Sequence, residues 1–362
     1  MDYNAVTYQI VSCRKIPSAY SWSTKWPPPP PRVTRALLDL VACLGIAAHG
    51  AAPQLEFVGQ WPEETRGFYE DAVAADGFLT VAASSGGVQT FDLRSPAAPA
   101  RAGELYGLPD LPWSIGRDGG RGLVAGFDGW LAALDFSSPA APAVTWQTNR
   151  FLRLAVLEVN GPLAVVAGAA DLSGNLRIEV WDLGNPAQPR LRGSLTRGQT
   201  WTEGNLVFDG THAYLRVTGP PSGLLHVDVS RPDAPVASLV PDSATIGIHL
   251  SRSGDRLLAA GRFQPTLWSV ADPATPVVLN TNLFEGESIA AGLLAGTRVY
   301  LAGTTNLHLL DVSDPAAPVV LGSAPLQGSA VEGGVPPPGE GVEGDRGRCL
   351  PGAADGDPPH AP

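Results

Sequence analysis

The sequence predicts an all-β fold, a β-propeller of six complete four-stranded blades, with the start of an incomplete seventh blade as an open alternative. Three observations lead to this prediction. A short proline-containing motif recurs six times, its period is nearly constant, and each period contains four short strand-like runs. Repeats of about 40–45 residues built from four strands are typical of propeller blades.

Each copy of the motif has an apolar strand that ends in a polar residue, a Pro-x-x-Pro turn and a second strand. The copies read FDLRSPAAPA from Phe91, LDFSSPAAPA from Leu134, WDLGNPAQPR from Trp181, VDVSRPDAPV from Val227, WSVADPATPV from Trp268 and LDVSDPAAPV from Leu310. Their first prolines are 41 to 47 residues apart. Because proline lacks a backbone donor and fixes φ, it ends a ladder and starts a turn. We therefore place each motif between the third and fourth strands of a blade.

Five motifs carry an aspartate at the end of their first strand, and the fifth motif carries Ser269 instead. The aspartates are Asp92, Asp135, Asp182, Asp228 and Asp311. Short polar side chains at turns accept hydrogen bonds from nearby backbone N–H groups, so we expect a structural role at the corner. A ring of carboxylates that binds a cation is the alternative.

The sequence between the motifs repeats as well. The last unit reads ESIAAGLLAG, TRVYLAGT, TNLHLLDV and APVVLGS from Glu287 onward, and the other units divide in the same way. A parallel β-helix needs a much shorter period, and immunoglobulin-like domains need about twice this one. The glycine, proline and β-branched residues in every run exclude helical repeats.

The unit LDVSDPAAPVVLG, from Leu310 to Gly322, resembles the LVIVD repeat of prokaryotic extracytoplasmic β-propeller proteins. The resemblance covers roughly residues 53–324. It implies a secreted or surface propeller, and it implies little about a ligand or an activity because the family is defined by its repeat.

Composition narrows the possible partners. The formal net charge is −11 and only 16% of residues are charged. Proteins that bind nucleic acid through its phosphates need the opposite sign, so we expect no nucleic-acid partner. The three cysteines, Cys13, Cys43 and Cys349, lie outside the repeats, so we expect packing and hydrogen bonds to hold the fold.

Residues 32–50, RVTRALLDLVACLGIAAHG, have a basic flank, an apolar stretch and small residues, the layout of a secretory signal. The stretch is too short for a stable membrane-spanning helix. We expect the mature chain to begin near Ala51, with no integral membrane span, in a secreted, periplasmic or cell-surface location. Lipidation of Cys43 is the alternative. Residues 1–31 resemble neither a signal nor a folded element, so we expect them to be non-native or disordered.

The propeller is expected over residues 51–324 and a disordered Gly/Pro-rich tail over residues 325–362. Leu55–Trp61, LEFVGQW, resembles the strand that follows each motif and has no sheet of its own. LQGSAVEGG from Leu326 resembles the start of another unit. A seventh blade lost through truncation or a reading-frame shift is one interpretation, and a six-bladed ring with a disordered tail is the other.

No catalytic, cofactor-binding or metal-binding constellation stands out. His212, His226, His249 and His308 are scattered over the repeats, so we interpret them as half-buried strand residues. Asp171–Asn175 is interpreted as an extended hairpin tip rather than a calcium loop. A ligand face is the hypothesis for the aromatic and acidic residues in the segments that lead into the first strands, with packing between blades as the alternative. These residues are Tyr69, Glu70, Trp113, Trp201, Glu203, Glu285 and Glu287.

The sequence therefore favours an extracytoplasmic binding or scaffold module for an unknown protein, peptide or glycan, rather than an enzyme. A propeller hydrolase or quinone-dependent dehydrogenase with a metal at the channel is one alternative, although the leading segments of the second and fifth units offer only Asp110 and Asp242. A structural surface domain of a longer protein is the other.

Overall fold

The structure, a computed structural model, describes residues 6–8, 70–95, 98–198, 201–219, 221–241, 247–261 and 264–326. The expected signal segment, the three cysteines, Tyr69, Asp242, Leu55–Trp61 and the tail after residue 326 lie outside these ranges. Of residues 1–31, the structure describes β1 (Val6–Tyr8), which pairs antiparallel with the first strand of the first blade. The expectations for the signal and the two ends remain predictions.

Six antiparallel blades of four strands each follow one another along the chain, as the repeat predicts, and β1 adds a fifth strand to the sheet of the first blade. The first three blades consist of β2 (Asp71–Ala75), β3 (Phe78–Ala82), β4 (Val88–Asp92), β5 (Ala100–Leu105); β6 (Pro112–Asp118), β7 (Arg121–Gly126), β8 (Trp130–Asp135), β9 (Ala143–Asn149); and β10 (Arg153–Asn160), β11 (Leu163–Ala169), β12 (Leu176–Asp182), β13 (Arg190–Arg197). The last three consist of β14 (Trp201–Phe208), β15 (His212–Thr218), β16 (Gly223–Asp228), β17 (Val236–Pro241); β18 (His249–Ser253), β19 (Arg256–Ala260), β20 (Thr266–Ser269), β21 (Val277–Asn280); and β22 (Ile289–Ala295), β23 (Arg298–Gly303), β24 (Asn306–Asp311), β25 (Val319–Pro325).

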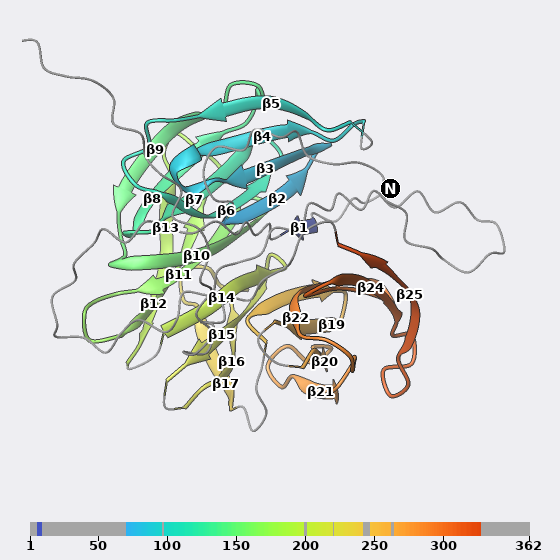
Figure 1. Cartoon of the computed structure of the whole chain (residues 1–362). Helices are drawn as coiled ribbons and strands as arrows, with labels where there is room; N and C mark the ends of the chain where they lie inside the picture. Colours follow the sequence, from blue (N-terminus) through green and yellow to red (C-terminus); the bar gives the residue numbers. More distant parts are fainter. Residues whose placement is uncertain are drawn as a thin grey trace, which may run out of the picture.

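Figure 1 shows the sheets in chain order around an axis, from blue for the first blade to orange for the sixth. In every sheet the strands pair in sequence order, and the first strands of consecutive blades, from β2 and β6 to β18 and β22, pack against each other. The first strand of each blade is therefore the innermost and the fourth is the outermost. This is a six-bladed β-propeller. The described residues include no helix long and apolar enough to cross a membrane.

The proline motifs form the turns between third and fourth strands. In all six, the residue before the first proline accepts a hydrogen bond from the residue three positions later, as Ser138 does from Ala141 N at 2.9 Å. Proline suits the second position of such a turn because its φ is already fixed. The aspartates act as expected: Asp135, for example, accepts a hydrogen bond from Ser137 N at 2.8 Å, and Ser269 does so more weakly from Ala271 N at 3.4 Å.

The motif also joins neighbouring blades, which its sequence does not reveal. Thr145 Oγ1 of β9 donates to Pro186 O of the next blade at 2.7 Å, and Asn280 Nδ2 of β21 donates to Pro315 O at 2.8 Å. Gly103 of β5 shows how closely the blades approach, because a Cβ atom there would lie 2.5 Å from Pro139 O. The proline turns of the second, third and sixth blades thus also contact the outermost strand of the preceding blade.

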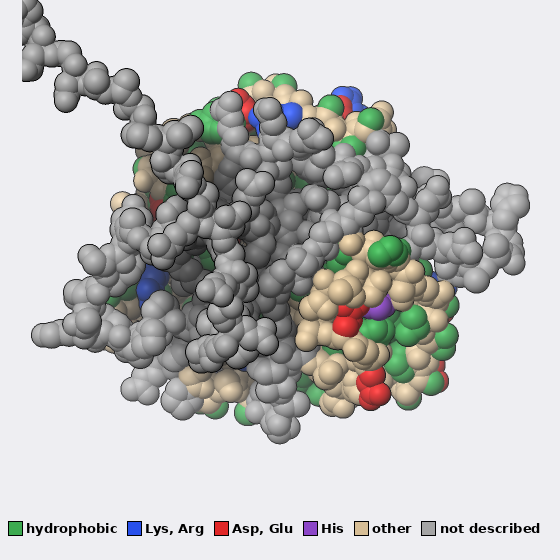
Figure 2. Space-filling model, in the orientation of Figure 1, with side chains coloured by type: hydrophobic (Ala, Val, Ile, Leu, Met, Phe, Trp, Pro, Cys, Tyr) green, Lys and Arg blue, Asp and Glu red, His purple; other side chains and the backbone are tan. Residues whose placement is uncertain are grey.

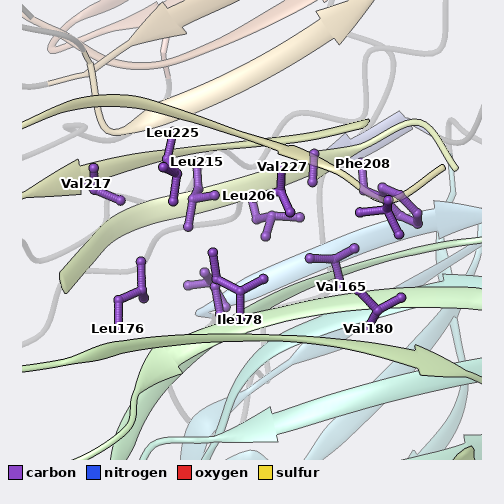
Figure 3. Packing of buried hydrophobic residues seen from close by; sticks show 14 residues of the cluster. Val165, Leu176, Ile178, Val180, Leu206, Phe208, Leu215, Val217, Leu225 and Val227 are labelled. Carbon is purple, nitrogen blue, oxygen red and sulfur yellow. The ribbon is translucent and has the colours of Figure 1, made fainter. Parts of the chain in front are cut away.

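Apolar side chains fill the space between adjacent blades. Figure 3 shows the layer between the third and fourth blades, where Val165, Ile178 and Val180 face Leu206 and Leu215. Four further clusters join blades one and two, two and three, four and five, and five and six. A sheet with one apolar face must bury that face against another layer, and stacking successive blades does so.

Candidate functional site

The outermost strand of each blade connects to the innermost strand of the next at one end of the ring, which we call the connection face. The predicted residues lie there: Glu70 immediately precedes β2, Trp113 is the second residue of β6, and Glu285 and Glu287 lie between β21 and β22. Trp201 and Glu203 belong to β14, and their side chains are outside the described part of the structure, as is Tyr69.

Glu287 is held by a dense set of hydrogen bonds in the sixth blade. Its Oε2 atom accepts from Thr304 Oγ1 at 2.8 Å, from Thr305 N at 2.8 Å and from Thr305 Oγ1 at 3.0 Å. Its Oε1 atom lies 2.6 Å from His308 Nε2. Burial alone would raise the pKa of this carboxyl, but the hydrogen bonds from Thr304, His308 and Thr305 lower it to about 2. Glu287 therefore fixes the turn between β23 and β24.

Asp110 holds a turn of the second blade in the same way. Its Oδ2 atom accepts from Asp128 N at 2.7 Å, in the turn between β7 and β8, and its Oδ1 atom accepts from Leu111 N at 2.7 Å. Gly126 and Gly303 lie against Asp110 and Glu287 so closely that neither has space for a Cβ atom. Two of the carboxylates in the leading segments thus hold turns together, and any ligand contact by them would be additional.

Glu285 and Trp113 differ in their surroundings. Glu285 is exposed and accepts a hydrogen bond from Asn282 Nδ2 at 2.6 Å. Trp113 is half-buried and packs edge-on against Phe127, with ring centroids 5.6 Å apart. Trp113 therefore packs within its own blade rather than standing free on the surface.

A shallow hollow of about 350 Å³ lies at the connection face between the first and second blades. Its lining includes Ser84, Ser85, Tyr106, Asp110, Leu111 and Asp128. Tyr106 is 38% exposed and Leu111 is 47% exposed, so the rim offers one aromatic and one aliphatic side chain to solvent. Ser84 has a φ of 45°, a left-handed conformation that is uncommon outside glycine and is found preferentially at functional loops.

The hollow combines apolar and acidic groups within one small area. The Tyr106 hydroxyl donates to Glu104 Oε2 at 2.6 Å, which fixes the ring at the rim. Asp110 and Asp128 add two carboxylates to the same lining. The sequence hypothesis did not include Ser84, Ser85 or Tyr106, because these residues come from separate turns that only the folded ring brings together.

The histidines lie on strands as expected, although three of them are buried rather than half-buried: His226 at 3%, His249 at 5% and His308 at 6% exposure. His212 Nδ1 and His226 Nε2 are 3.0 Å apart on the neighbouring strands β15 and β16. Burial lowers the pKa of His226, and the proximity of His212 lowers it further. This pair could not be predicted from the sequence, because the two side chains meet only through the register of β15 and β16.

Acidic side chains (red) and a histidine (purple) appear in Figure 2 on the part of the sixth blade that faces the viewer. Within the described ranges, His, Cys, Asp and Glu side chains do not form groups of three or more that could hold a metal ion.

Asp171 holds a hairpin tip as expected, accepting hydrogen bonds from Ser173 N at 2.8 Å and Asn175 Nδ2 at 2.7 Å.

No protein-family model and no curated protein matches this chain. Among solved structures, it is similar to the computationally designed Ika8 protein, with a TM-score of 0.54 and 12% identity over 73% of this chain and 76% of that chain. A chain from a nidogen–laminin complex matches with a TM-score of 0.44 and 12% identity over 68% of this chain and 92% of that chain, below the level that indicates a common fold. The likeness to the designed protein concerns the fold alone.

Proposed function

We propose that this chain is an extracytoplasmic propeller of the LVIVD type that binds a peptide or glycan in the hollow between its first and second blades. The repeat resemblance of Leu310–Gly322 and the signal-like residues 32–50 support the family and the location. The propeller fold supports a binding or scaffold role, because such rings present loops from many blades on one face.

The composition of the hollow is the observation that carries the proposal. Tyr106 and Leu111 provide exposed apolar surface, while Asp110 and Asp128 provide negative charge. Ligand sites commonly combine apolar walls with a few fixed polar groups. The net charge of −11 favours the approach of a ligand with cationic or hydrogen-bond-donating groups. A short peptide containing lysine or arginine meets these conditions best, and a neutral oligosaccharide meets them in part.

The test uses the chain from Ala51 onward, screened against a displayed random-peptide library and a panel of immobilised oligosaccharides. Binders are then measured by calorimetry against Tyr106→Ala and Asp128→Asn, with Val277→Ser as the control. Val277 is 60% exposed on the outermost strand of the fifth blade, away from the lining of the hollow. We expect Tyr106→Ala to weaken binding at least about tenfold, as truncating an aromatic anchor commonly does, and Val277→Ser to leave it unchanged.

Binders that respond equally to Tyr106→Ala and Val277→Ser would contradict the hollow as the site. Absence of any binder from both collections would favour the structural surface domain instead. The enzymatic alternative gains no support from the described residues, since Asp110 and Glu287, two of the carboxylates in the leading segments, are engaged in holding turns.

A further inference from the structure

A completely buried carboxylate of the third blade contacts two arginines at the connection face. Glu179 of β12 is 0% exposed. Its Oε1 atom accepts a hydrogen bond from Arg150 Nη2 at 2.6 Å and lies 3.9 Å from Arg177 Nη1. Its Oε2 atom accepts from Arg150 Nε at 3.3 Å and from Trp181 Nε1 at 3.0 Å. Both oxygens of this carboxylate are therefore used inside the blade.

The fifth blade shows that the tryptophan alone does not need a carboxylate. Trp268 occupies the position of Trp181 in its own blade, one residue before the end of the third strand, and its Nε1 donates to Thr266 Oγ1 at 3.0 Å. The hydroxyl group of Thr266 is neutral, so it satisfies the indole without the desolvation cost of a buried charge. In the third blade the charge of Glu179 therefore serves the two arginines.

Arg150 and Arg177 are held in place while part of each side chain remains exposed. The Arg150 side chain is 33% exposed and the Arg177 side chain 31%. Arg177 Nη1 also donates to Arg150 O at 3.0 Å, and the Arg150 guanidinium carbon lies 5.8 Å from the centre of the Trp181 ring. A guanidinium group has five N–H donors, so Glu179 uses only part of this capacity. The remaining donors of a fixed fork suit the two oxygens of a carboxylate.

Positive charge is in excess at this end of the third blade, although the whole chain is acidic. Arg153 begins β10 and Arg197 ends β13, so both lie at the same end of the sheet as Arg177. The four arginines described there outnumber the two described carboxylates, Asp171 and Glu179. The local field therefore favours an anion, against the sign of the overall net charge of −11.

The arginine pair, Arg150 and Arg177, lies next to the hollow. Asp128 lines the hollow, and Gly129 follows it in the chain. Gly129 O accepts hydrogen bonds from Arg150 N at 3.2 Å and from Phe151 N at 3.3 Å. A Cβ atom on Gly129 would lie 2.0 Å from Phe151 O, which shows how closely the two segments approach. The connection face thus has negative charge in the hollow and positive charge immediately beside it.

We propose that Arg150 and Arg177 bind a carboxylate of the ligand, and that this ligand is a peptide with an acidic residue in addition to its lysine or arginine. The assignment rests on the proposed function of the hollow and narrows its ligand class. A peptide presents an apolar side chain and a cation to the hollow and a carboxylate to the arginine pair. A neutral oligosaccharide offers a charge to neither, and an acidic one offers no cation to Asp110 and Asp128. Glu179 is a positioning residue in this site.

The arginine pair is tested first without the hollow, by titrating the full chain with sodium N-acetylglutamate. The side-chain Nε–Hε signals of the arginines are followed by NMR and assigned from Arg150→Lys, Arg177→Gln and Arg190→Gln. We expect saturable shifts of the Arg150 and Arg177 signals. Arg190 is exposed at the opposite end of β13, so it reports the effect of ionic strength alone. Shifts of Arg150 and Arg177 that do not saturate, like those of Arg190, would overturn the proposal.

The peptide assignment is tested with the binders selected for the hollow. Each is compared with a version in which the acidic residue is replaced by its amide, Glu by Gln or Asp by Asn. We expect this replacement to weaken binding to the parent chain roughly three- to tenfold, and to weaken binding to Arg177→Gln at most about twofold, because one of the two guanidinium groups is then absent. Arg190→Gln removes the same charge from the same blade and should keep the full parental effect. Equal effects on the parent chain and on Arg177→Gln would overturn the peptide assignment.

The two measurements separate this proposal from the proposed function. Tyr106→Ala weakens the peptide binders if the hollow is their site, and it should leave the N-acetylglutamate titration unchanged. Binders that carry no acidic residue would overturn the peptide assignment and leave the hollow in place. If no binder is selected, the proposed function fails and the peptide assignment fails with it, while saturable shifts of Arg150 and Arg177 would still support a carboxylate site.

Discussion

Asp71 and Ser114 lie on β2 and β6, the adjacent innermost strands of the first and second blades, and a hydrogen bond joins them: Asp71 Oδ2 accepts from Ser114 Oγ at 2.8 Å. The same oxygen accepts from Ile115 N at 3.1 Å, and Ser114 Oγ accepts in turn from Leu157 N of the third blade at 3.2 Å. Asn205 with Leu250, and Ser251 with Leu294, repeat this link between later blades. Polar side chains thus connect the innermost strands of neighbouring blades.

Replacing Asp71 with alanine should lower the free energy of unfolding by about 2–4 kcal/mol. Asp71 is 4% exposed, and its loss leaves the Ser114 hydroxyl and two backbone N–H groups without their acceptor. Denaturant titration measures the change. Asp255→Ala, at an exposed turn, is the control and should change stability by less than about 0.5 kcal/mol. Equal effects of the two substitutions would show that the link between the innermost strands contributes nothing.

Replacing Thr145 with valine should lower the free energy of unfolding by about 1 kcal/mol, because valine keeps the shape of the side chain and removes its hydrogen bond to Pro186 O. Thr196→Val is the matched control, since Thr196 is exposed on the outermost strand of the next blade. The two variants are compared by denaturant titration under identical conditions. If Thr145→Val proves as stable as Thr196→Val, the proline turns do not hold neighbouring blades together.

The blades were predictable from the sequence because the proline motif is local. Ser138, Pro139 and Ala141 form their turn within four residues, so the local sequence is enough to predict the geometry of the turn. The links between blades were not predictable, because Thr145 and Pro186 are 41 residues apart. The candidate site depends on the same distant contacts: Ser84, Tyr106 and Asp128 come from three separate segments, and Glu287 meets His308 only through the pairing of strands.

The pair formed by His212 and His226 should make stability depend on pH near neutrality. The pKa of His226 is lowered in the folded chain from its ordinary value of 6.5, first by burial and then by His212. The unfolded chain therefore takes up a proton before the folded chain does. The stabilisation is complete above pH 6.5 and is lost as the pH falls below that value toward the lowered pKa.

We expect His226→Phe to reduce the loss of stability between about pH 7.5 and pH 5.5, because phenylalanine keeps the ring contact with Tyr214 and cannot titrate. Thermal unfolding at the two pH values measures the loss. Tyr214→Phe is the control. Burial raises the pKa of Tyr214 to about 12, so its hydroxyl group stays protonated at both pH values. Removing this hydroxyl group should therefore lower the Tm equally at both. A pH dependence in His226→Phe as steep as in the parent chain would show that the histidine pair is not its source.

Glu287 should make stability depend on pH in a separate, more acidic range. Its pKa is about 2 in the folded chain against an ordinary value of 4.5, so the unfolded chain binds the proton first as the pH falls. The stabilisation is fully present above pH 4.5 and is lost between pH 4.5 and about pH 2. Glu287→Gln keeps most of the hydrogen-bonding shape but cannot ionise, so its Tm should fall less than that of the parent chain between about pH 5 and pH 3. Asn282→Ala, in the same connection and without a titratable group, should keep the full parental fall. A Glu287→Gln variant that loses as much as Asn282→Ala would mean that the carboxylate at the turn between β23 and β24 does not stabilise the sixth blade through its charge.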